Sequence, residues 1–194
     1  MSDTLLLVLL STLAYLGGSV LFALPVCRLW QLPDPRTRGS GNPGASNVYR
    51  VGGGTPAAIA LLLDAAKGAL PVWLAGHLGL PVSAQAVVAL CAVTGHMAPL
   101  FLRFQGGKGV ATALGTGLAL APATTLLISG VWILIFWRWR VSALASVIAA
   151  LCGPLVSVLV DPDALLLFGL LAVFIVMRHR TNLVRLAQGR ENRF

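Results

Sequence analysis

The stretch "LLLVLLSTLAYLGGSVLFALPV", residues 5–26, carries no charged side chain and is long enough to cross a lipid bilayer as a helix. A secretory signal peptide would place a basic leader before its apolar run, whereas here Asp3 precedes it. The run is also longer than the roughly 7–15 apolar residues of such a signal. We therefore interpret residues 4–26 as a first membrane helix that the mature protein keeps.

The whole chain shares this apolar character. Of its 194 residues 57% are hydrophobic and only 10% are charged, and the mean hydropathy is +0.87. A soluble domain would carry about 25% charged residues. We expect an all-α, polytopic integral membrane helix bundle that forms a single domain over residues 1–194. The net charge of +8 would suggest nucleic acid for a soluble protein. In a membrane protein it marks the cytoplasmic ends of the spans, so we expect no nucleic-acid partner.

Apolar runs bounded by charges, proline or glycine predict about seven membrane helices. They cover residues 4–26, 56–76, 83–102, 110–121, 122–137, 141–160 and 163–177. The fourth and fifth are short for a span of about 20 residues, so five, six or seven spans are possible and seven is favoured.

The distribution of charge favours seven spans. With the N-terminus outside, the loops 27–55 and 103–109, the turn after residue 137 and the tail 178–194 all face the cytoplasm. These segments hold every Lys and Arg of the chain except Lys67. The positive-inside rule predicts this asymmetry, and merging the fourth and fifth helices would break it. We therefore predict an outer N-terminus and a cytoplasmic C-terminus.

A polar, glycine-rich segment, "RTRGSGNPGASNVYR" (36–50), lies in the first of these loops. Glycine permits tight turns that point successive N–H groups into one concavity, which binds anions. The guanidinium of Arg50 is a planar fork suited to phosphate. A flexible linker is the alternative, but linkers rarely mix Asn, Ser and Arg so densely. The candidate anion-binding residues are Ser40, Asn42, Gly44, Ser46, Asn47 and Arg50.

A second polar stretch, "GHMAPLFLRFQGGKGVAT" (95–112), joins a glycine loop to a predicted helix beginning near Val110. The free N–H groups and the dipole at a helix start favour phosphate. The loop is not a Walker A motif, because Leu102 occupies the place of its first glycine and Gly109 follows the lysine. These residues alone are equally compatible with a glycine-rich turn that binds no ligand, in which Lys108 is present only because cytoplasmic loops are rich in basic residues. The candidate residues are His96, Gly106, Gly107, Lys108, Gly109 and Thr112.

Two charged residues, Asp64 and Lys67, interrupt the second apolar run. They are three residues apart, so they share a helix face and can pair. A charge facing lipid costs about 2.5–3.5 kcal/mol, which predicts that both side chains face the protein interior. We favour a structural ion pair over contact with substrate.

The C-terminal segment "RHRTNLVRLAQGRENRF" (178–194) combines five arginines with His179, Asn182 and Glu191. Such arginines often only anchor a chain against anionic lipid. If the last helix continues, however, His179, Asn182 and Arg185 share one face of it.

Three of these stretches together resemble one protein family. "GSGNPGASN" (39–47) with Arg50 resembles the first cytoplasmic motif of the bacterial acyl-phosphate-dependent glycerol-3-phosphate acyltransferases, the PlsY family. Residues 95–112 resemble the second motif, "RHRTNLVRL" (178–186) resembles the third, and "DAAKG" (64–68) is similar to a recurrent family stretch. The order of the motifs, the length of the chain and the predicted topology fit as well. Ser46 stands where threonine is usual.

The resemblance implies transfer of a fatty acyl group from acyl phosphate to the 1-hydroxyl of glycerol 3-phosphate, giving lysophosphatidic acid and phosphate in the bacterial inner membrane. It assigns Ser40, Arg50, His179 and Asn182 to catalysis and the loop around Lys108 to glycerol 3-phosphate. Four further residues are expected to be structural or to contact the site residues without contacting substrate: Asp64, Lys67, Arg185 and Glu191. We expect no metal and no cofactor. Besides the two substrates, the expected partner is membrane lipid. A monomer would be sufficient to form the whole site.

The proton acceptor has several candidates. His179 or His96 could accept the hydroxyl proton, but no acidic residue in the motifs is placed to orient a histidine. Because an acyl phosphate is already activated, we favour its own phosphate as the base. A small anion or phosphate transporter is the alternative function. Such a protein would be expected to carry charged sites near the midplane and internal symmetry, and only Asp64 and Lys67 approach that description.

Overall fold

The structure is a computed structural model that describes residues 2–194, and over these residues it contains helices and no strand. This confirms the predicted all-α class. The α-helices are α1 (Asp3–Gly18), α2 (Ala23–Leu29), α3 (Ala45–Gly52), α4 (Gly54–His77), α5 (Val82–Met97), α6 (Val110–Leu120), α7 (Pro122–Trp139), α8 (Ser142–Val160), α9 (Leu165–Arg178) and α10 (Arg180–Ala187). Short 3₁₀ helices, η1 (Leu100–Leu102) and η2 (Pro162–Ala164), follow α5 and α8.

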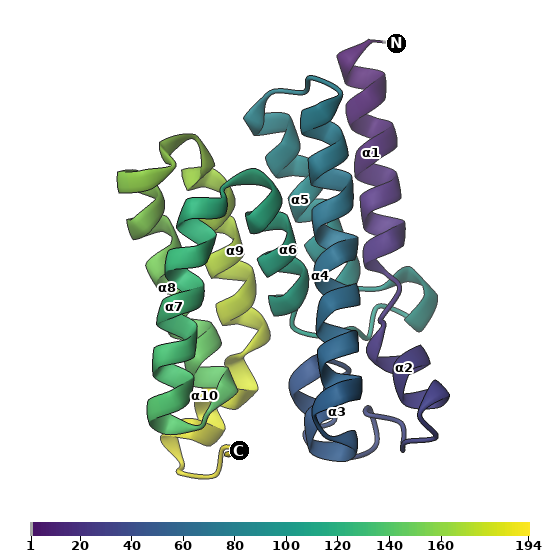
Figure 1. Cartoon of the computed structure of the whole chain (residues 1–194), viewed down its shortest axis with the longest axis vertical. Helices are drawn as coiled ribbons and strands as arrows, with labels where there is room; N and C mark the ends of the chain where they lie inside the picture. Colours follow the sequence, from purple (N-terminus) through teal and green to yellow (C-terminus); the bar gives the residue numbers. More distant parts are fainter. Residues whose placement is uncertain (1) are drawn as a thin grey trace.

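The helices form two groups with α6 between them (Figure 1). In one group α1 packs on α5, and α4 packs on both α5 and α6; in the other, α8 packs on α7 and α9. Small residues allow the first group to pack closely, as is common in membranes. A side chain at Gly95 of α5 would collide with the Tyr15 carbonyl of α1, and one at Gly115 of α6 would collide with the Ala65 carbonyl of α4.

By length and composition, the structure supports four to six membrane spans, which includes two of the predicted counts but not the favoured count of seven. Four segments are each long and apolar enough to cross a bilayer: α4, α5 with η1, α7 and α8. The count rises to six if the bent pairs α1–α2 and α9–α10 are each one span. The predicted span 110–121 is helical only over the 11 residues of α6, which corresponds to about 16 Å against a hydrocarbon core of about 30 Å. Seven full spans are therefore not confirmed.

The predicted first helix, 4–26, is broken. It ends at Gly18 and resumes at Ala23 with a bend of 40°. Backbone groups freed by the break find partners on α4, because the Lys67 ammonium donates to the Val20 carbonyl (2.6 Å) and the Asp64 carboxylate accepts from the Phe22 N–H (3.4 Å). Inside a membrane, such groups need a protein partner. The intramembrane charges therefore compensate for the broken helix.

Two segments predicted as loops are partly helical. Within 27–55, α3 forms because Val48 is buried in a small apolar cluster with Ala23 and Val26 of α2. Within 178–194, α10 follows α9 after a bend of 59°. α10 ("RTNLVRLA") is polar, in contrast to the apolar α9 that precedes it.

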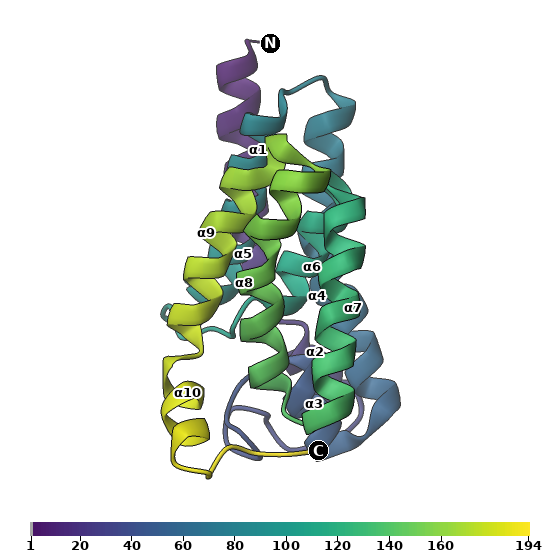
Figure 2. The ribbon, with the colours of Figure 1, turned by 90° about the vertical axis from the view of Figure 1, so that its left-hand side faces the viewer.

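The motif-bearing segments gather toward the end of the bundle that carries the C-terminus (Figures 1 and 2). There α2, α3, α10 and the α7–α8 turn lie together, while the N-terminus and the α4–α5, α6–α7 and α8–α9 connections lie toward the opposite end. The segment between α5 and α6 lies nearer the middle of the bundle than α3 and α10 do. This arrangement places the glycine-rich segments around one region.

Candidate active site

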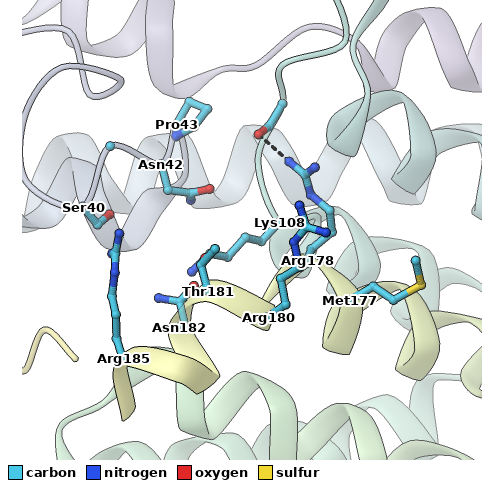
Figure 3. Close-up of a pocket in the computed structure, with 12 residues that line it drawn as sticks. Ser40, Asn42, Pro43, Lys108, Met177, Arg178, Arg180, Thr181, Asn182 and Arg185 are labelled. Carbon is cyan, nitrogen blue, oxygen red and sulfur yellow. Dashed lines mark hydrogen bonds between the residues drawn. The ribbon is translucent and has the colours of Figure 1, made fainter. Parts of the chain in front are cut away.

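A cavity of about 440 Å³ lies where the first polar segment, the glycine loop (residues 105–109) and the α9–α10 junction meet (Figure 3). Its walls include six of the residues predicted from the sequence: Ser40, Asn42, Gly106, Lys108, Asn182 and Arg185. Three segments that are distant in the sequence thus build one site.

The walls of this cavity are strongly cationic. They carry Lys108, Arg178, Arg180 and Arg185, and no carboxylate within residues 2–194 lines them. Burial is the largest of the effects that lower the pKa of Lys108 to about 8; the Glu191 charge opposes it, and the charges of Arg50, Arg185 and Arg178 add to it. Cations held this close repel one another, so the cavity is suited to an anion.

Asn47 supports the first segment and does not line the cavity. Its side chain is fully buried and donates to the carbonyls of Pro35 (2.6 Å) and Arg38 (2.9 Å), while its amide oxygen accepts from the Ser40 N–H (2.8 Å). We expected Asn47 to bind substrate, but the loop already uses these donors and this acceptor. Its role in the structure is to hold Ser40 at the cavity wall.

The other predicted residues of this segment also lie outside the cavity walls. Gly44 is the N-cap of α3, and the Ser46 hydroxyl contacts the Ser142 hydroxyl of α8 (3.0 Å). Arg50 lies under the Phe194 ring, with its guanidinium carbon 4.1 Å from the ring centroid. The Arg50 Nε is buried without a hydrogen-bond partner. The Nε edge of the guanidinium thus has neither a hydrogen-bond partner within residues 2–194 nor access to solvent, and its face is covered by the ring.

The glycine loop rests on the end of α5. The Gly107 N–H donates to the His96 carbonyl (3.1 Å), and a side chain at Gly107 would collide with the His96 ring. Gly109 has a φ of +76° where α6 begins, a conformation that favours glycine. The predicted helix start at Val110 is confirmed, and Lys108 reaches into the cavity.

Behind the loop, a buried polar network joins α4, α5 and α6. Lys67 pairs with Asp64 (2.7 Å) and also lies 3.0 Å from Nδ1 of His96, which in turn lies 3.2 Å from the Thr112 hydroxyl. The predicted pairing of Asp64 with Lys67 is therefore confirmed. His96 and Thr112, predicted to bind substrate, are buried here and do not line the cavity. This placement favours a supporting role for both.

His179 lies at the bend between α9 and α10, and Asn182 lies in α10, within the segment predicted as a loop. His179 is 2% exposed, and its Nδ1–H donates to the Ile175 carbonyl (2.8 Å). Burial, with a further effect from the Lys108 charge, lowers its pKa to about 4. Asn182 lines the cavity and donates to the Glu191 carboxylate (2.7 Å). Asn182 is thus placed to meet a ligand, whereas His179 is neutral at pH 7 and lies behind the wall.

Several wall residues were not singled out from the sequence. The most engaged is Arg178, whose guanidinium donates to the carbonyls of Gly106 (2.8 Å) and Gly107 (3.0 and 2.8 Å). The remaining ones are Gly41, Pro43, Met177, Arg180 and Thr181. Arg178 and Arg180 end an apolar run, where the positive-inside rule alone accounts for them. Only their place within the third motif could have drawn attention to them.

This fold and site define a polytopic membrane protein with a cationic cavity suited to an anion. The chain belongs to the glycerol-3-phosphate acyltransferase family, whose model matches residues 8–189. It is therefore an integral membrane acyltransferase.

Relatives and solved structures agree with this assignment. Glycerol-3-phosphate acyltransferases of Hahella chejuensis and Pseudomonas putida KT2440 are each 51% identical to the chain. The first match covers 95% of both chains, and the second covers 96% of this chain and 98% of the relative. A crystal structure of PlsY, an integral membrane glycerol 3-phosphate acyltransferase, in its glycerol 3-phosphate form superposes with a TM-score of 0.91 at 36% identity, over 97% of this chain and 95% of that one. The lysophosphatidic acid form of PlsY gives a TM-score of 0.89 at 35% identity, with the same coverage of both chains.

Proposed function

We propose that the chain transfers a fatty acyl group from acyl phosphate to the 1-hydroxyl of glycerol 3-phosphate, forming lysophosphatidic acid and inorganic phosphate. The observation that carries this proposal is the cationic cavity between two glycine-rich segments, because both proposed substrates bear a phosphate. The similar PlsY structures in glycerol 3-phosphate and lysophosphatidic acid forms support the acceptor and the product.

The two phosphates occupy different sides of the cavity in this account. Lys108, with the glycine loop, holds the phosphate of glycerol 3-phosphate. Ser40 at the cavity wall and Arg50, which belongs to the same segment but is not itself a wall residue, hold the acyl-phosphate end; the planar guanidinium suits a phosphate oxygen. Asn182 lines the wall between them. Fixing two dianions in attack geometry can lower the barrier by several kcal/mol, with about 7–11 as the upper range for ideal orientation.

The reaction needs no covalent enzyme intermediate. The 1-hydroxyl oxygen attacks the acyl carbonyl carbon, the bond between that carbon and the bridging phosphate oxygen breaks, and the hydroxyl proton passes to the departing phosphate. The products are the ester and hydrogen phosphate, so atoms and charges balance. A pKa of about 4 makes His179 a weak base at pH 7, which supports the phosphate as proton acceptor.

The cavity is proposed to face the cytoplasm from the bacterial inner membrane. The basic residues concentrate in the segments 27–55, 103–109, 138–140 and 178–194, and the positive-inside rule places such segments in the cytoplasm. The alkyl chain of the donor can then remain in the apolar part of the membrane. Ser40, Lys108 and Asn182 meet within one copy of the chain, and a monomer is proposed to suffice for the reaction.

The test is acyl transfer by purified, detergent-solubilised protein to labelled glycerol 3-phosphate. Palmitoyl phosphate, palmitoyl-CoA and palmitoyl carrier protein are supplied in separate reactions. Labelled lysophosphatidic acid from palmitoyl phosphate alone is expected. Product from palmitoyl-CoA or the carrier protein at an equal rate would overturn the donor assignment. Phosphate uptake into proteoliposomes without acyl transfer would favour the transporter instead.

A further inference from the structure

The glycine loop is pressed against α5 on one side. Besides the hydrogen bond from Gly107 to the His96 carbonyl, neither Gly106 nor Gly107 has room for a side chain. An added Cβ at Gly106 would collide with the His96 carbonyl, and one at Gly107 with the His96 ring. The backbone of the loop therefore cannot move toward α5.

On the other side, the side chain of Arg178 is the one that donates hydrogen bonds to the loop within residues 2–194. Its Nε donates to the Gly107 carbonyl (3.0 Å), and its Nη2 donates to the carbonyls of both Gly106 and Gly107 (2.8 Å each). Figure 3 shows the bond to Gly106 as a dashed line beside Lys108. A planar guanidinium can engage two adjacent carbonyls in fixed geometry, whereas an ammonium acts as a point charge. The contact therefore depends on arginine and not only on positive charge.

These hydrogen bonds matter because carbonyl oxygens repel phosphate. The carbonyls of Gly106 and Gly107 belong to the residues directly before Lys108, at a wall suited to anions. If they were free, their partial negative charges would oppose a phosphate bound to Lys108. Arg178 engages both of them, and its position at the last residue of α9 connects the third motif to the second.

We propose that Arg178 is a positioning residue of this acyltransferase: it holds the Gly106 and Gly107 carbonyls so that the loop presents Lys108 to a substrate phosphate. Arg178 acts through the loop and need not touch the substrate. That this phosphate belongs to glycerol 3-phosphate rests on the proposed function. The alternative is that Arg178 binds the substrate phosphate directly. Its Nη1 makes no hydrogen bond within the part of the chain described by the structure, so this atom has the capacity to donate to a phosphate.

Hydrogen exchange of the loop amides distinguishes the two roles. The full-length protein is compared in detergent, without substrate, with Arg178→Lys, Arg178→Gln and the matched control Arg180→Gln. The control removes a charge from the same cavity at a residue without a hydrogen bond to the loop. We expect the amides of residues 105–109 to exchange about tenfold faster or more in both Arg178 variants and at the wild-type rate in the control.

Kinetics provide the second readout. The KM for glycerol 3-phosphate should rise about tenfold in both Arg178 variants, while the KM for the acyl donor changes by less than about twofold. Unchanged loop exchange in Arg178→Gln, or full recovery of both readouts by Arg178→Lys, would overturn the proposal. If Arg178→Gln does not fold, Arg178→Lys alone tests the proposal, because lysine keeps the positive charge and lacks the planar guanidinium that engages both carbonyls. Faster exchange with a raised KM for the donor would confirm the positioning role and reject only the substrate assignment.

Discussion

The Phe194 ring lies over the Arg50 guanidinium, 4.1 Å from ring centroid to guanidinium carbon, and also contacts the rings of Tyr49 and Phe136. The Phe194 N–H donates to the Arg140 carbonyl (2.9 Å), which fixes the ring in place. A cation–π contact of this kind contributes about 0.5–2 kcal/mol. The C-terminal segment thus orients a predicted catalytic arginine that makes only one weak hydrogen bond, to the Ser46 carbonyl (3.5 Å).

Replacing Phe194 by Ala is expected to lower kcat/KM for the acyl donor by about 2- to 30-fold, because Arg50 loses the ring that holds it. Phe194→Tyr keeps the ring and serves as the matched control, with activity near wild type. Steady-state kinetics with varied donor measure the effect. Equal losses in both variants, or none in Phe194→Ala, would contradict the role of the ring.

The ion pair of Asp64 and Lys67 gives a stability prediction. Both side chains are buried, and Lys67 also donates to a backbone carbonyl freed by the break in the first span. Lys67→Met should therefore leave the Asp64 carboxylate unpaired and lower the free energy of unfolding by about 3–5 kcal/mol. The double variant Asp64→Leu/Lys67→Met should cost less than the single one, since no charge remains unpaired. Thermal unfolding in detergent measures both. Additive losses would show that the two residues do not act as a pair.

The pKa of Lys108 predicts an alkaline limit to activity. The protonated ammonium binds phosphate, so kcat/KM for glycerol 3-phosphate should be steady below a pH of about 8 and fall above it, by up to about tenfold per pH unit. Arginine stays charged over this range, so Lys108→Arg should remove the alkaline fall whatever its absolute activity. Persistence of the same fall in Lys108→Arg would assign it to another group.

His179 provides a test of the proton acceptor. Loss of a general base typically costs about 10²–10⁴-fold in rate. With the donor phosphate as base, His179→Ala should lose less than about 100-fold and retain activity well above background, provided that it folds. Turnover assays paired with binding of glycerol 3-phosphate measure this. Complete loss of turnover with intact binding would make His179 the base.

Periodicity and spacing predicted much of the fold and part of the site. Apolar runs located the helices, and the three-residue spacing of Asp64 and Lys67 predicted their pairing. The glycine loop and the helix start at Val110 were also predicted correctly, because glycine and the following apolar run are local signals. Ser40, Lys108 and Asn182 do line one cavity.

Features that depend on tertiary partners were missed. The break after Gly18 lies within a continuous apolar run and is stabilised by Asp64 and Lys67, which are distant in the sequence. The sequence also could not show that the Asn47 amide hydrogen-bonds within its own loop and not to a ligand. Its partners, the Pro35 and Arg38 carbonyls, come close to it only once the loop has folded.

The most direct test of the account separates the two phosphate positions by comparing Lys108→Ala with Arg50→Ala. Initial rates are measured with each substrate varied in turn, after both variants are shown to unfold at the wild-type temperature. We expect Lys108→Ala to raise chiefly the KM for glycerol 3-phosphate and Arg50→Ala to lower chiefly kcat/KM for the acyl donor. The same change for both substrates in both variants would contradict a cavity in which separate segments hold the two phosphates.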